Sequence, residues 1–199
     1  MADAPVPYPV AARELLRSTL LDAMREELAT REWASVTMAE VARAAGVSRQ
    51  TLYKAFGSRQ EFAQAYVLRE VDCFLEDVEA AVRAHFDEPA RAIAAAFATF
   101  LSAAAEDPFV RGIVSGESGG ELLPLVTTQG QPVLEHATER LAAFLADGWP
   151  QMTPEQARLL AECVVRLAIS HAALPSGPAG LTADSVATLL DPYLAGVLA

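Results

Sequence analysis

A cluster of hydrogen-bonding side chains follows Ser48 within six residues. Its members are Arg49, Gln50, Thr51, Tyr53 and Lys54. Arginine and glutamine form paired hydrogen bonds with guanine and adenine, whereas threonine, tyrosine and lysine bind phosphate oxygens. Burial in a protein core does not explain so many polar side chains on one short segment. Their chemistry is typical of a surface that enters the major groove of double-stranded DNA.

The segments around this cluster predict two short helices joined by a tight turn. Thr37 begins a capping box, which predicts a helix over Met38–Ala45. Gly46 permits a sharp turn, and Ser48 is a typical N-cap for a second helix over Arg49–Phe56. The apolar residues expected between the two helices are Val41, Ala42, Ala45, Leu52 and Phe56. This arrangement is a helix-turn-helix, and it leaves the polar cluster outside the core.

The composition favours an all-helical protein with a substantial hydrophobic core. The chain has 199 residues, of which 52% are hydrophobic and 7% aromatic, and alanine, the best helix former, is abundant. The longest uncharged runs are Ala92–Ala105, which is too short to span a bilayer, and Leu167–Ala183, which proline and glycine interrupt. We therefore expect no membrane-spanning helix and no signal peptide. For Cys73 and Cys163 we expect reduced, buried thiols in a cytoplasmic protein.

The net charge of −11 is unevenly distributed along the chain. Residues 1–69 carry a net charge of +1, whereas residues 70–199 carry −12. The basic residues near the polar cluster are Arg43, Arg49, Lys54, Arg59 and Arg69, and the acid among them is Glu61. A local positive patch suits phosphate contact, and an acidic remainder repels DNA from other faces. On charge alone, however, a solvated helix surface is the simpler interpretation.

The remaining segments also follow the three-and-four spacing of amphipathic helices. Residues 1–10 are expected to form a flexible arm, and Ala11–Arg31 to form the first helix. Further helices are expected from Ser58 to about Phe86, from Pro89 onward, and over Asp107–Val114, Val133–Leu145, Thr153–His171 and Ala183–Val197, the last one capped by Thr182 and kinked at Pro192. A loop is expected at Ser115–Leu123 and a turn at Pro175–Gly180. No segment predicts a strand.

The sequence from Thr37 to Phe62 resembles the TetR family of bacterial one-component repressors, and the resemblance covers about Ala11–Arg69. It implies an all-α fold, with a three-helix DNA-binding domain over residues 11–57 and a ligand-binding and dimerisation domain over residues 58–199. It also implies a dimer that binds a palindromic operator and is released by a small effector. Two positions depart from the family pattern, because a small residue is common where Gln50 stands and lysine where Arg59 stands.

The resemblance assigns roles in DNA binding by position. Thr37 and Ser48 are expected at helix N-termini near phosphates. The residues expected to contact the phosphate backbone are Thr51, Tyr53, Lys54 and Arg59. Arg49 and Gln50 are the candidates for base edges, because arginine suits guanine and glutamine suits adenine. The alternative for Tyr53 is partial burial against the preceding helix, and the alternative for Arg49 is a charge that faces solvent.

For the C-terminal part, the resemblance implies an architecture without a matching residue code. The last two helices are expected to form a four-helix bundle with a partner, through Leu160, Val164, Leu167, Val186, Leu190 and Leu194. A ligand pocket is expected among the middle helices, lined by Phe74, Val78, Phe97, Phe100, Leu101, Phe109, Ile113, Leu134, Leu141 and Phe144. Both sets have the alternative of being ordinary intramolecular core.

The candidate pocket wall is apolar, which suits an apolar effector better than a sugar or a nucleotide. Residues 57–71 are also similar to actinobacterial family members tied to alkane and fatty-acid metabolism. That similarity implies a long-chain acyl or alkyl ligand. No cofactor is expected, and His85, His136 and His171 lack the spacing of a metal site.

Two other functions compete with DNA binding. The stretch Gly116–Gly120 fits the nucleophile-elbow pattern around Ser118, with Asp147 and His171 following in the order of an α/β-hydrolase. Such an enzyme needs a strand before Ser118 on a parallel sheet, whereas the flanking segments predict helices. The other alternative is a helical interaction protein that does not bind DNA. The intact set of Arg49 and its polar neighbours argues against it.

Overall fold

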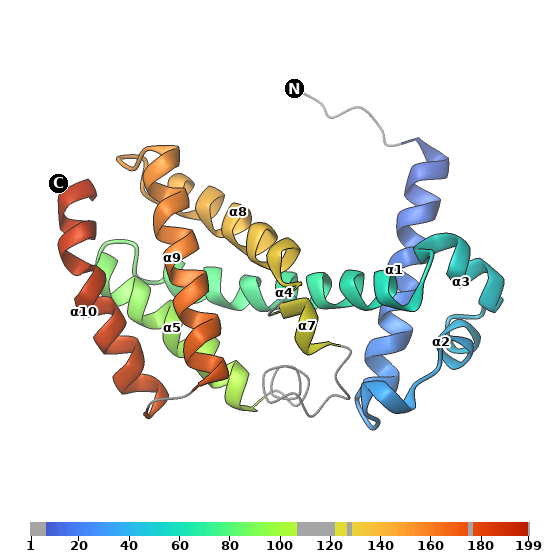
Figure 1. Cartoon of the computed structure of the whole chain (residues 1–199). Coiled ribbons are helices and arrows are strands. Elements are labelled where there is room, and N and C mark those ends of the chain that lie inside the picture. The colour runs from blue at the N-terminus through green and yellow to red at the C-terminus, as the bar shows by residue number, and fades with distance from the viewer. Residues whose placement is uncertain (1–6, 107–121, 127–128, 175–176, 199) are drawn as a thin grey trace. The chain divides into compact units, whose positions relative to one another are not determined.

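In the computed structural model, which describes residues 7–106, 122–126, 129–174 and 177–198, the chain is all-helical. Figure 1 shows the helices and their connections, and none of these described residues lies in a strand. The all-α fold class predicted from the sequence is therefore confirmed. The helix predicted over Asp107–Val114 and most of the loop predicted after it lie outside the described residues. No helix within the described ranges is long and apolar enough to cross a membrane.

The helices form two compact units, the first ending at Tyr66 and the second beginning at Val67. The first unit contains α1 (Tyr8–Leu28), the single-turn helix η1 (Trp33–Ser35), α2 (Met38–Ala44) and α3 (Arg49–Phe56). A continuous helix, α4 (Arg59–Arg83), contributes its first residues to this unit and the rest to the second. The second unit also contains α5 (Pro89–Glu106), α7 (Leu123–Val126), α8 (Gln131–Gly148), α9 (Pro154–Ala173) and α10 (Ala179–Leu198).

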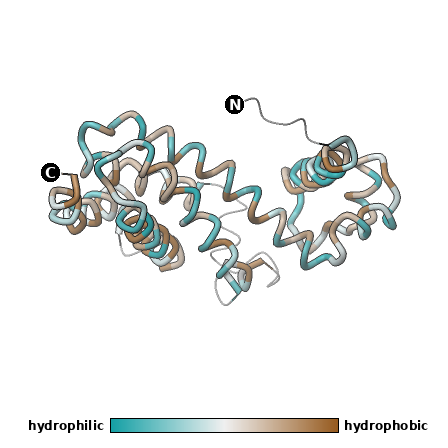
Figure 2. Tube along the Cα trace, turned by 90° about the horizontal axis from the view of Figure 1, so that it is seen from above, coloured by the Kyte–Doolittle hydropathy of each residue, from teal (hydrophilic) through white to brown (hydrophobic). Residues whose placement is uncertain are grey.

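Each unit is built from helices with an apolar face. Figure 2 shows this as brown and teal stretches that alternate along the helical trace. In the second unit, α5 packs against α10, α8 packs against α9, and α5 also contacts α9. The buried side chains at the centre include Ile93, Phe97, Leu141, Leu160 and Leu194. Burial of these aliphatic and aromatic side chains, rather than any charged contact, is the main source of stability for such a bundle.

Aromatic side chains close the core of the first unit. The ring of Trp33 lies against Phe62 and Tyr66, with centroids 6.4 and 5.8 Å away, and Phe56 meets Phe62 edge-on at 4.7 Å. Phe62 and Tyr66 belong to α4. The first unit therefore extends past Gly57, where the sequence placed the end of the DNA-binding domain.

Several helix starts differ from the sequence prediction, and α8 begins at Gln131 rather than Val133. α1 begins at Tyr8, so the last three residues of the predicted arm are helical. Pro9 lies in the first turn, where the missing N–H of proline costs no helical hydrogen bond. α10 begins at Ala179, and Thr182, which was predicted as its N-cap, lies inside the helix. The Thr182 hydroxyl donates to the carbonyl of Pro178 at 3.3 Å instead.

Other helix starts follow the predicted caps. α3 spans the predicted residues, and its N-cap Ser48 accepts a hydrogen bond from the Thr51 N–H. α9 begins with the expected capping box, in which the Gln156 N–H donates to the Thr153 hydroxyl at 3.2 Å and the Gln156 side chain accepts from the Thr153 N–H at 2.8 Å. A reciprocal pair of this kind satisfies backbone donors that the first turn leaves unpaired, so it fixes where the helix begins.

Candidate functional site

The start of α2 is fixed by a capping box around Thr37. The Glu40 N–H donates to the Thr37 hydroxyl at 3.3 Å, and the Thr37 N–H donates to the Glu40 carboxylate at 2.8 Å. Arg31 joins this carboxylate at 3.2 Å and Glu27 of α1 at 2.8 Å. Hydrogen bonds from the Thr37 hydroxyl and N–H, and then from Arg31, lower the pKa of Glu40 to about 2. The predicted phosphate ligand Thr37 is therefore exposed at a helix N-terminus that is tied to α1.

The turn between α2 and α3 has the geometry of a helix-turn-helix. Gly46 adopts a left-handed conformation with φ of 69°, which glycine reaches without steric cost. The Val47 N–H then reaches back to the Ala42 carbonyl at 2.9 Å. Ser48 caps α3, with the Thr51 N–H 3.0 Å from its hydroxyl oxygen. The turn thus places a second helix start, at Ser48, close after the first helix ends.

α3 buries one side and exposes the other. Leu52 is fully buried and Phe56 is 3% exposed. The predicted base-contacting residues Arg49 and Gln50 are exposed, as is Lys54. Thr51 and Tyr53 are half-buried, so the alternative of partial burial holds for the tyrosine ring. The exposed residues share one face of α3 with Tyr53, because positions three and four apart on a helix are neighbours. The Arg49 guanidinium accordingly lies 5.3 Å from the centre of the Tyr53 ring.

Arg59 has an intramolecular role that the sequence did not indicate. Its guanidinium donates to the carbonyls of Val36 at 2.7 Å and Trp33 at 3.0 Å, and it stacks 5.2 Å from the Trp33 ring centre. The side chain is half-buried. Arg59 therefore fastens the start of α4 to the η1 turn. These contacts do not test the prediction that Arg59 binds a phosphate.

Arg17 is a second structural residue that sequence reasoning missed. It donates to the carbonyl of Ala55 and lies 4.0 Å above the Phe56 ring centre. It thereby ties the C-terminal end of α3 to α1. The available signal was an arginine on the α1 face that also carries the buried residues Leu20, Leu21 and Met24. A cation near the C-terminal end of a helix interacts favourably with its dipole, as Arg17 does at the end of α3.

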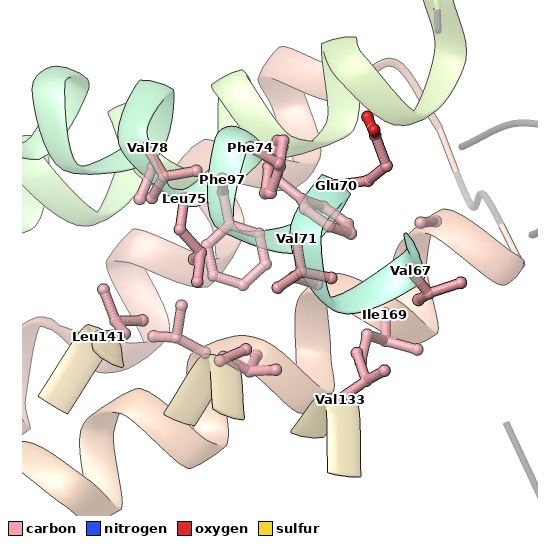
Figure 3. A pocket seen from close by; sticks show the side chains of 17 residues that line it. Val67, Glu70, Val71, Phe74, Leu75, Val78, Phe97, Val133, Leu141 and Ile169 are labelled. Atoms are coloured by element: carbon pink, nitrogen blue, oxygen red, sulfur yellow. The ribbon is translucent and has the colours of Figure 1, made fainter. Parts of the chain in front are cut away.

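The second unit contains an apolar cavity of about 150 Å³ between α4, α5, α8 and α9. Figure 3 shows side chains such as Val71, Leu75, Phe97 and Leu141 converging on it. The described lining consists of Val67, Glu70, Val71, Phe74, Leu75, Val78, Ala96, Phe97, Phe100, Val133, Ala137, Leu141, Val164, Val165, Ala168, Ile169 and Ala172. Within this lining Glu70 is the ionisable residue, and its carboxylate points away from Phe97 in Figure 3. The cavity suits an apolar ligand.

Half of the predicted pocket residues line this cavity. They are Phe74, Val78, Phe97, Phe100 and Leu141, and the rings of Phe74 and Phe100 meet edge-on at 5.2 Å. Three other predicted residues do not line this cavity. Leu101 is buried core, Leu134 lines a polar groove between α8 and α9, and Phe144 packs on Phe86 at 5.3 Å. Phe109 and Ile113 lie outside the described residues.

The lining residues that sequence reasoning missed are mostly small or β-branched. Val67, Val71 and Val133 belong to apolar stripes, and Ala137 and Ala168 provide space where α8 and α9 approach α4. Periodicity marks such residues as facing inward. It does not distinguish an alanine packed against a neighbour from one beside an empty space.

The predicted dimer residues also need correction. Leu160 and Leu194 are each 1% exposed within the single chain, and Val164 and Val186 are buried as well, so all four belong to its own core. Leu167 and Leu190 are half-buried and pack against the same core. The exposed leucines of α9 and α10 are Leu159, Leu181 and Leu189. The leucines that these two helices expose therefore differ from the predicted ones.

The residues of the competing hydrolase reading gain no support from the geometry. Ser118 lies outside the described residues, Asp147 is exposed near the end of α8, and His171 is half-buried in the last turn of α9. The described ranges contain none of the strands that the nucleophile elbow requires. Within the same ranges, no three histidine, cysteine, aspartate or glutamate side chains come together as metal ligands.

Two family models match the chain. The model for bacterial regulatory proteins of the tetR family matches residues 20–66. The model for the C-terminal domain of the bacterial Tetracyclin repressor matches residues 88–192. The first match spans the helix-turn-helix, and the second spans α5 to α10.

The relatives of the chain are regulators of similar length. Over 188 residues it is 39% identical to the HTH-type transcriptional regulator AlkX of Mycobacterium tuberculosis. This alignment covers 94% of the chain and 89% of the relative. The crystal structure of the TetR family repressor AlkX from Dietzia sp., implicated in biodegradation of n-alkanes, has a TM-score of 0.80 at 37% identity, covering 92% of this chain and 97% of that one. A TetR-family regulator from Streptomyces coelicolor, at 18% identity and a TM-score of 0.55, shows the fold alone.

Proposed function

Because the chain belongs to the TetR family of bacterial transcriptional regulators, we propose that it represses transcription by binding an inverted-repeat operator as a homodimer. The observation that carries this proposal is α3, a capped helix with one side anchored by Leu52 and the other side presenting Arg49, Gln50 and Lys54. Such a helix fits the major groove, where base edges are distinguishable. DNA in a bacterial cell is cytoplasmic, so we propose that the protein acts there.

The proposed DNA-contacting residues divide into base readers and phosphate ligands. Arg49 and Gln50 stand at the first turn of α3, the part of a recognition helix that contacts bases. The proposed phosphate ligands are Thr37, Ser48, Thr51, Tyr53, Lys54 and Arg59. Thr37 and Ser48 stand at helix N-termini, where backbone N–H groups and the helix dipole favour anions. Arg59 keeps its proposed phosphate role beside its hydrogen bonds to the Val36 and Trp33 carbonyls.

The proposed effector is an apolar acyl or alkyl chain that enters the cavity of the second unit. The support is the apolar lining and the alkane context of the Dietzia relative. The size sets a limit, because a cavity of about 150 Å³ is comparable to an engineered one that holds benzene. A chain of about ten carbons must therefore extend beyond this cavity or widen it. Effector binding would move the two recognition helices of the dimer away from the ~34–36 Å spacing of one DNA turn, as a population shift between two states.

The proposed dimer forms through the outward face of α9 and α10. Leu159, Leu181 and Leu189 are 55%, 66% and 69% exposed on these helices. Exposed leucines at three positions of these two helices are candidates for contact with a partner. A second copy of the chain is the occupant that suits an inverted-repeat operator, because a two-fold symmetric dimer mirrors the symmetry of the DNA.

The experiment for DNA binding is selection of random duplexes by the purified protein at moderate salt, followed by sequencing. Enrichment of an inverted repeat is the expected result. A folded, dimeric protein that enriches no sequence, even after unfolding, removal of bound ligand and refolding, would contradict the proposal. Repeating the selection after that treatment separates a ligand-inhibited repressor from a helix-turn-helix that does not bind DNA.

The experiment for the effector uses 1-decanol, decanoate and n-decane in a thermal-shift assay. We expect at least one of these chains to raise the unfolding temperature, because a ligand that binds only the folded state stabilises it. Ala137→Leu fills part of the cavity and should abolish the shift. Ala143→Leu, at an exposed position of the same helix, should preserve it. The effector proposal fails if no chain of medium or long length shifts the wild type.

A further inference from the structure

Four charged or titratable side chains join α4 to α8 in the second unit. We call them the charged seam: Asp72 and Glu79 on α4, His136 and Arg140 on α8. Nε of Arg140 donates to Glu79 at 2.7 Å, and another of its nitrogens lies 2.9 Å from the Asp72 carboxylate and 3.1 Å from the Asp72 carbonyl. His136 Nε2 lies 2.7 Å from the same carboxylate. The Arg140 guanidinium thus hydrogen-bonds to two residues of α4 that lie two turns apart.

The charged seam lies beside the cavity. On α4, Asp72 and Glu79 alternate with cavity residues such as Val71, Leu75 and Val78. On α8, His136 and Arg140 directly precede the cavity residues Ala137 and Leu141. The same pair of helices therefore carries an apolar wall and, on an adjoining face, a row of ionic contacts. Within the described part of the chain, the backbones of these two helices do not pack closely along their length, so side chains bridge them.

The contact between Arg140 and Glu79 is less exposed than an ordinary surface pair, whereas the Asp72 and His136 side chains are 40% and 39% exposed. The Glu79 side chain is 18% exposed and the Arg140 side chain 26% exposed. Partial burial weakens screening, and charge-assisted hydrogen bonds to two carboxylates restrict the guanidinium to one geometry. Burial opposes ionisation of Asp72, but hydrogen bonds from His136 and Arg140 outweigh it and hold the pKa of Asp72 below its ordinary value. Asp72 is therefore ionised at neutral pH.

We propose that the charged seam is a positioning device that sets the spacing of α4 and α8 in the effector-free protein. It thereby sets the effector concentration at which the regulator releases DNA. This inference rests on the proposed role of the cavity as the effector site. A chain that widens the cavity separates α4 from α8 or shifts them along each other, and either movement stretches the contacts of Arg140 to Asp72 and Glu79. α4 is one continuous helix with residues in both units.

Whether loss of the charged seam raises or lowers the effector concentration for DNA release depends on the state in which the seam contacts are made. A contact made in the effector-free state and stretched in the effector-bound state favours the DNA-binding form. Loss of the seam should therefore make the regulator respond to less effector. We expect Arg140→Gln to lower the decanoate concentration for half-maximal operator release at least about fivefold, the lower end of ordinary coupling between sites. Arg140→Lys keeps the charge but cannot hydrogen-bond to Asp72 and Glu79 together in the same geometry. Its half-maximal decanoate concentration should therefore lie between those of the wild type and Arg140→Gln.

The experiment compares Arg140→Gln with Arg166→Gln. Arg166 also pairs with a glutamate at 2.9 Å, but the partner is Glu162 one turn away on the same helix. Two quantities are measured on each full-length protein. One is operator release by decanoate, and the other is amide hydrogen exchange of residues 67–83 without DNA or effector. If Arg140→Gln does not fold, Glu79→Gln removes one of the two contacts as a milder substitution.

The outcomes separate this inference from the proposed function. Faster exchange in α4 together with an earlier release, in Arg140→Gln but not in Arg166→Gln, supports the positioning role. Unchanged exchange in α4 overturns it, and so does a release curve that coincides with the wild type. If decanoate releases neither the variant nor the wild type, the proposed effector is contradicted. The exchange comparison then still decides whether the seam holds α4 against α8.

Discussion

At the scale of residues, the cationic side chains of the first unit differ in whether they already make contacts within the protein. Arg49 and Lys54 are exposed on α3, whereas Arg17 and Arg59 already serve backbone carbonyls and aromatic rings. A count of positive charges does not distinguish these residues. The contacts show that Arg17 and Arg59 hold the helices in place, whatever Arg59 also contributes to phosphate binding.

The first prediction distinguishes a base reader from a phosphate ligand. Arg49→Ala should reduce discrimination between the selected operator and a scrambled duplex by about 1–3 kcal/mol, because a bidentate base contact is lost. Lys54→Ala should weaken binding to both duplexes alike and reduce the salt slope of binding by about 1. Titrations of both duplexes at several salt concentrations measure these quantities. Equal losses on both duplexes for both variants would refute the assignment.

The second prediction concerns Arg59. Arg59→Ala should lower the free energy of unfolding by about 1–3 kcal/mol, because the carbonyls of Val36 and Trp33 lose a charged donor. Urea unfolding measures this loss, with Lys54→Ala as the matched control that removes an exposed cation. If the two variants are equally stable, the contacts seen here contribute nothing to folding. Loss of DNA affinity by Arg59→Ala is interpretable only after this comparison.

At the scale of elements, the caps and turns that build the helix-turn-helix were the most predictable features. α3 begins after Ser48 and ends before Gly57, as the sequence predicts. A serine N-cap and a glycine with φ of 80° each depend only on residues close in sequence, so both could be predicted. Distant contacts were not predictable in the same way. The carbonyl partners of Arg59 lie 23 and 26 residues away, and only the folded arrangement brings them together.

The third prediction is a pH dependence at the start of α2. The folded-state pKa of Glu40, about 2, lies below the ordinary value of 4.5, so its ionised form stabilises the fold. That stabilisation is complete above about pH 4.5 and is lost as the pH falls toward 2. Glu40→Gln keeps a capping amide but does not titrate. The difference in urea midpoint between wild type and Glu40→Gln should therefore shrink on acidification, and a difference that stays constant between pH 6 and 2 would contradict this account.

The fourth prediction tests the turn at Gly46. Gly46→Ala should destabilise the protein by about 1–2 kcal/mol, because a side chain at φ of 69° meets the following carbonyl. Gly46→Asn should cost less, since asparagine tolerates the left-handed conformation. A Cβ added at this position meets no other atom within 4 Å, so the cost arises from the backbone alone. Thermal unfolding compares the two variants, and equal stabilities would refute the argument.

At the scale of the whole molecule, the sequence was less informative about surfaces and spaces. The fold class followed from alanine content and helical spacing. The phase of α9 and α10 did not, because apolar residues occur on both sides of these helices: Leu159 is exposed while its neighbour Leu160 is buried. The cavity was half predicted for a related reason. A stripe of apolar residues shows which side chains face inward, but whether Phe97 or Leu101 borders an empty space depends on how the helices pack.

The fifth prediction concerns self-association. Leu159→Asp and Leu189→Asp should each shift the protein from dimer toward monomer, because they place a charge on the proposed interface. Leu15→Asp is the matched control, since Leu15 is as exposed as Leu189 but belongs to α1 of the first unit. Sedimentation velocity at several concentrations measures the shift. Dimers that persist in both α9 and α10 variants would place the interface elsewhere.

The central claim is that an operator-binding surface on α3 responds to an apolar chain bound in the second unit. The most direct test is the fraction of selected operator that wild-type protein binds as the concentration of decanoate or 1-decanol rises. We predict release by at least one of the two chains, and no release when Ala137→Leu narrows the cavity while operator affinity is retained. Operator binding that no chain alters, or release that is identical in Ala137→Leu, would contradict the claim.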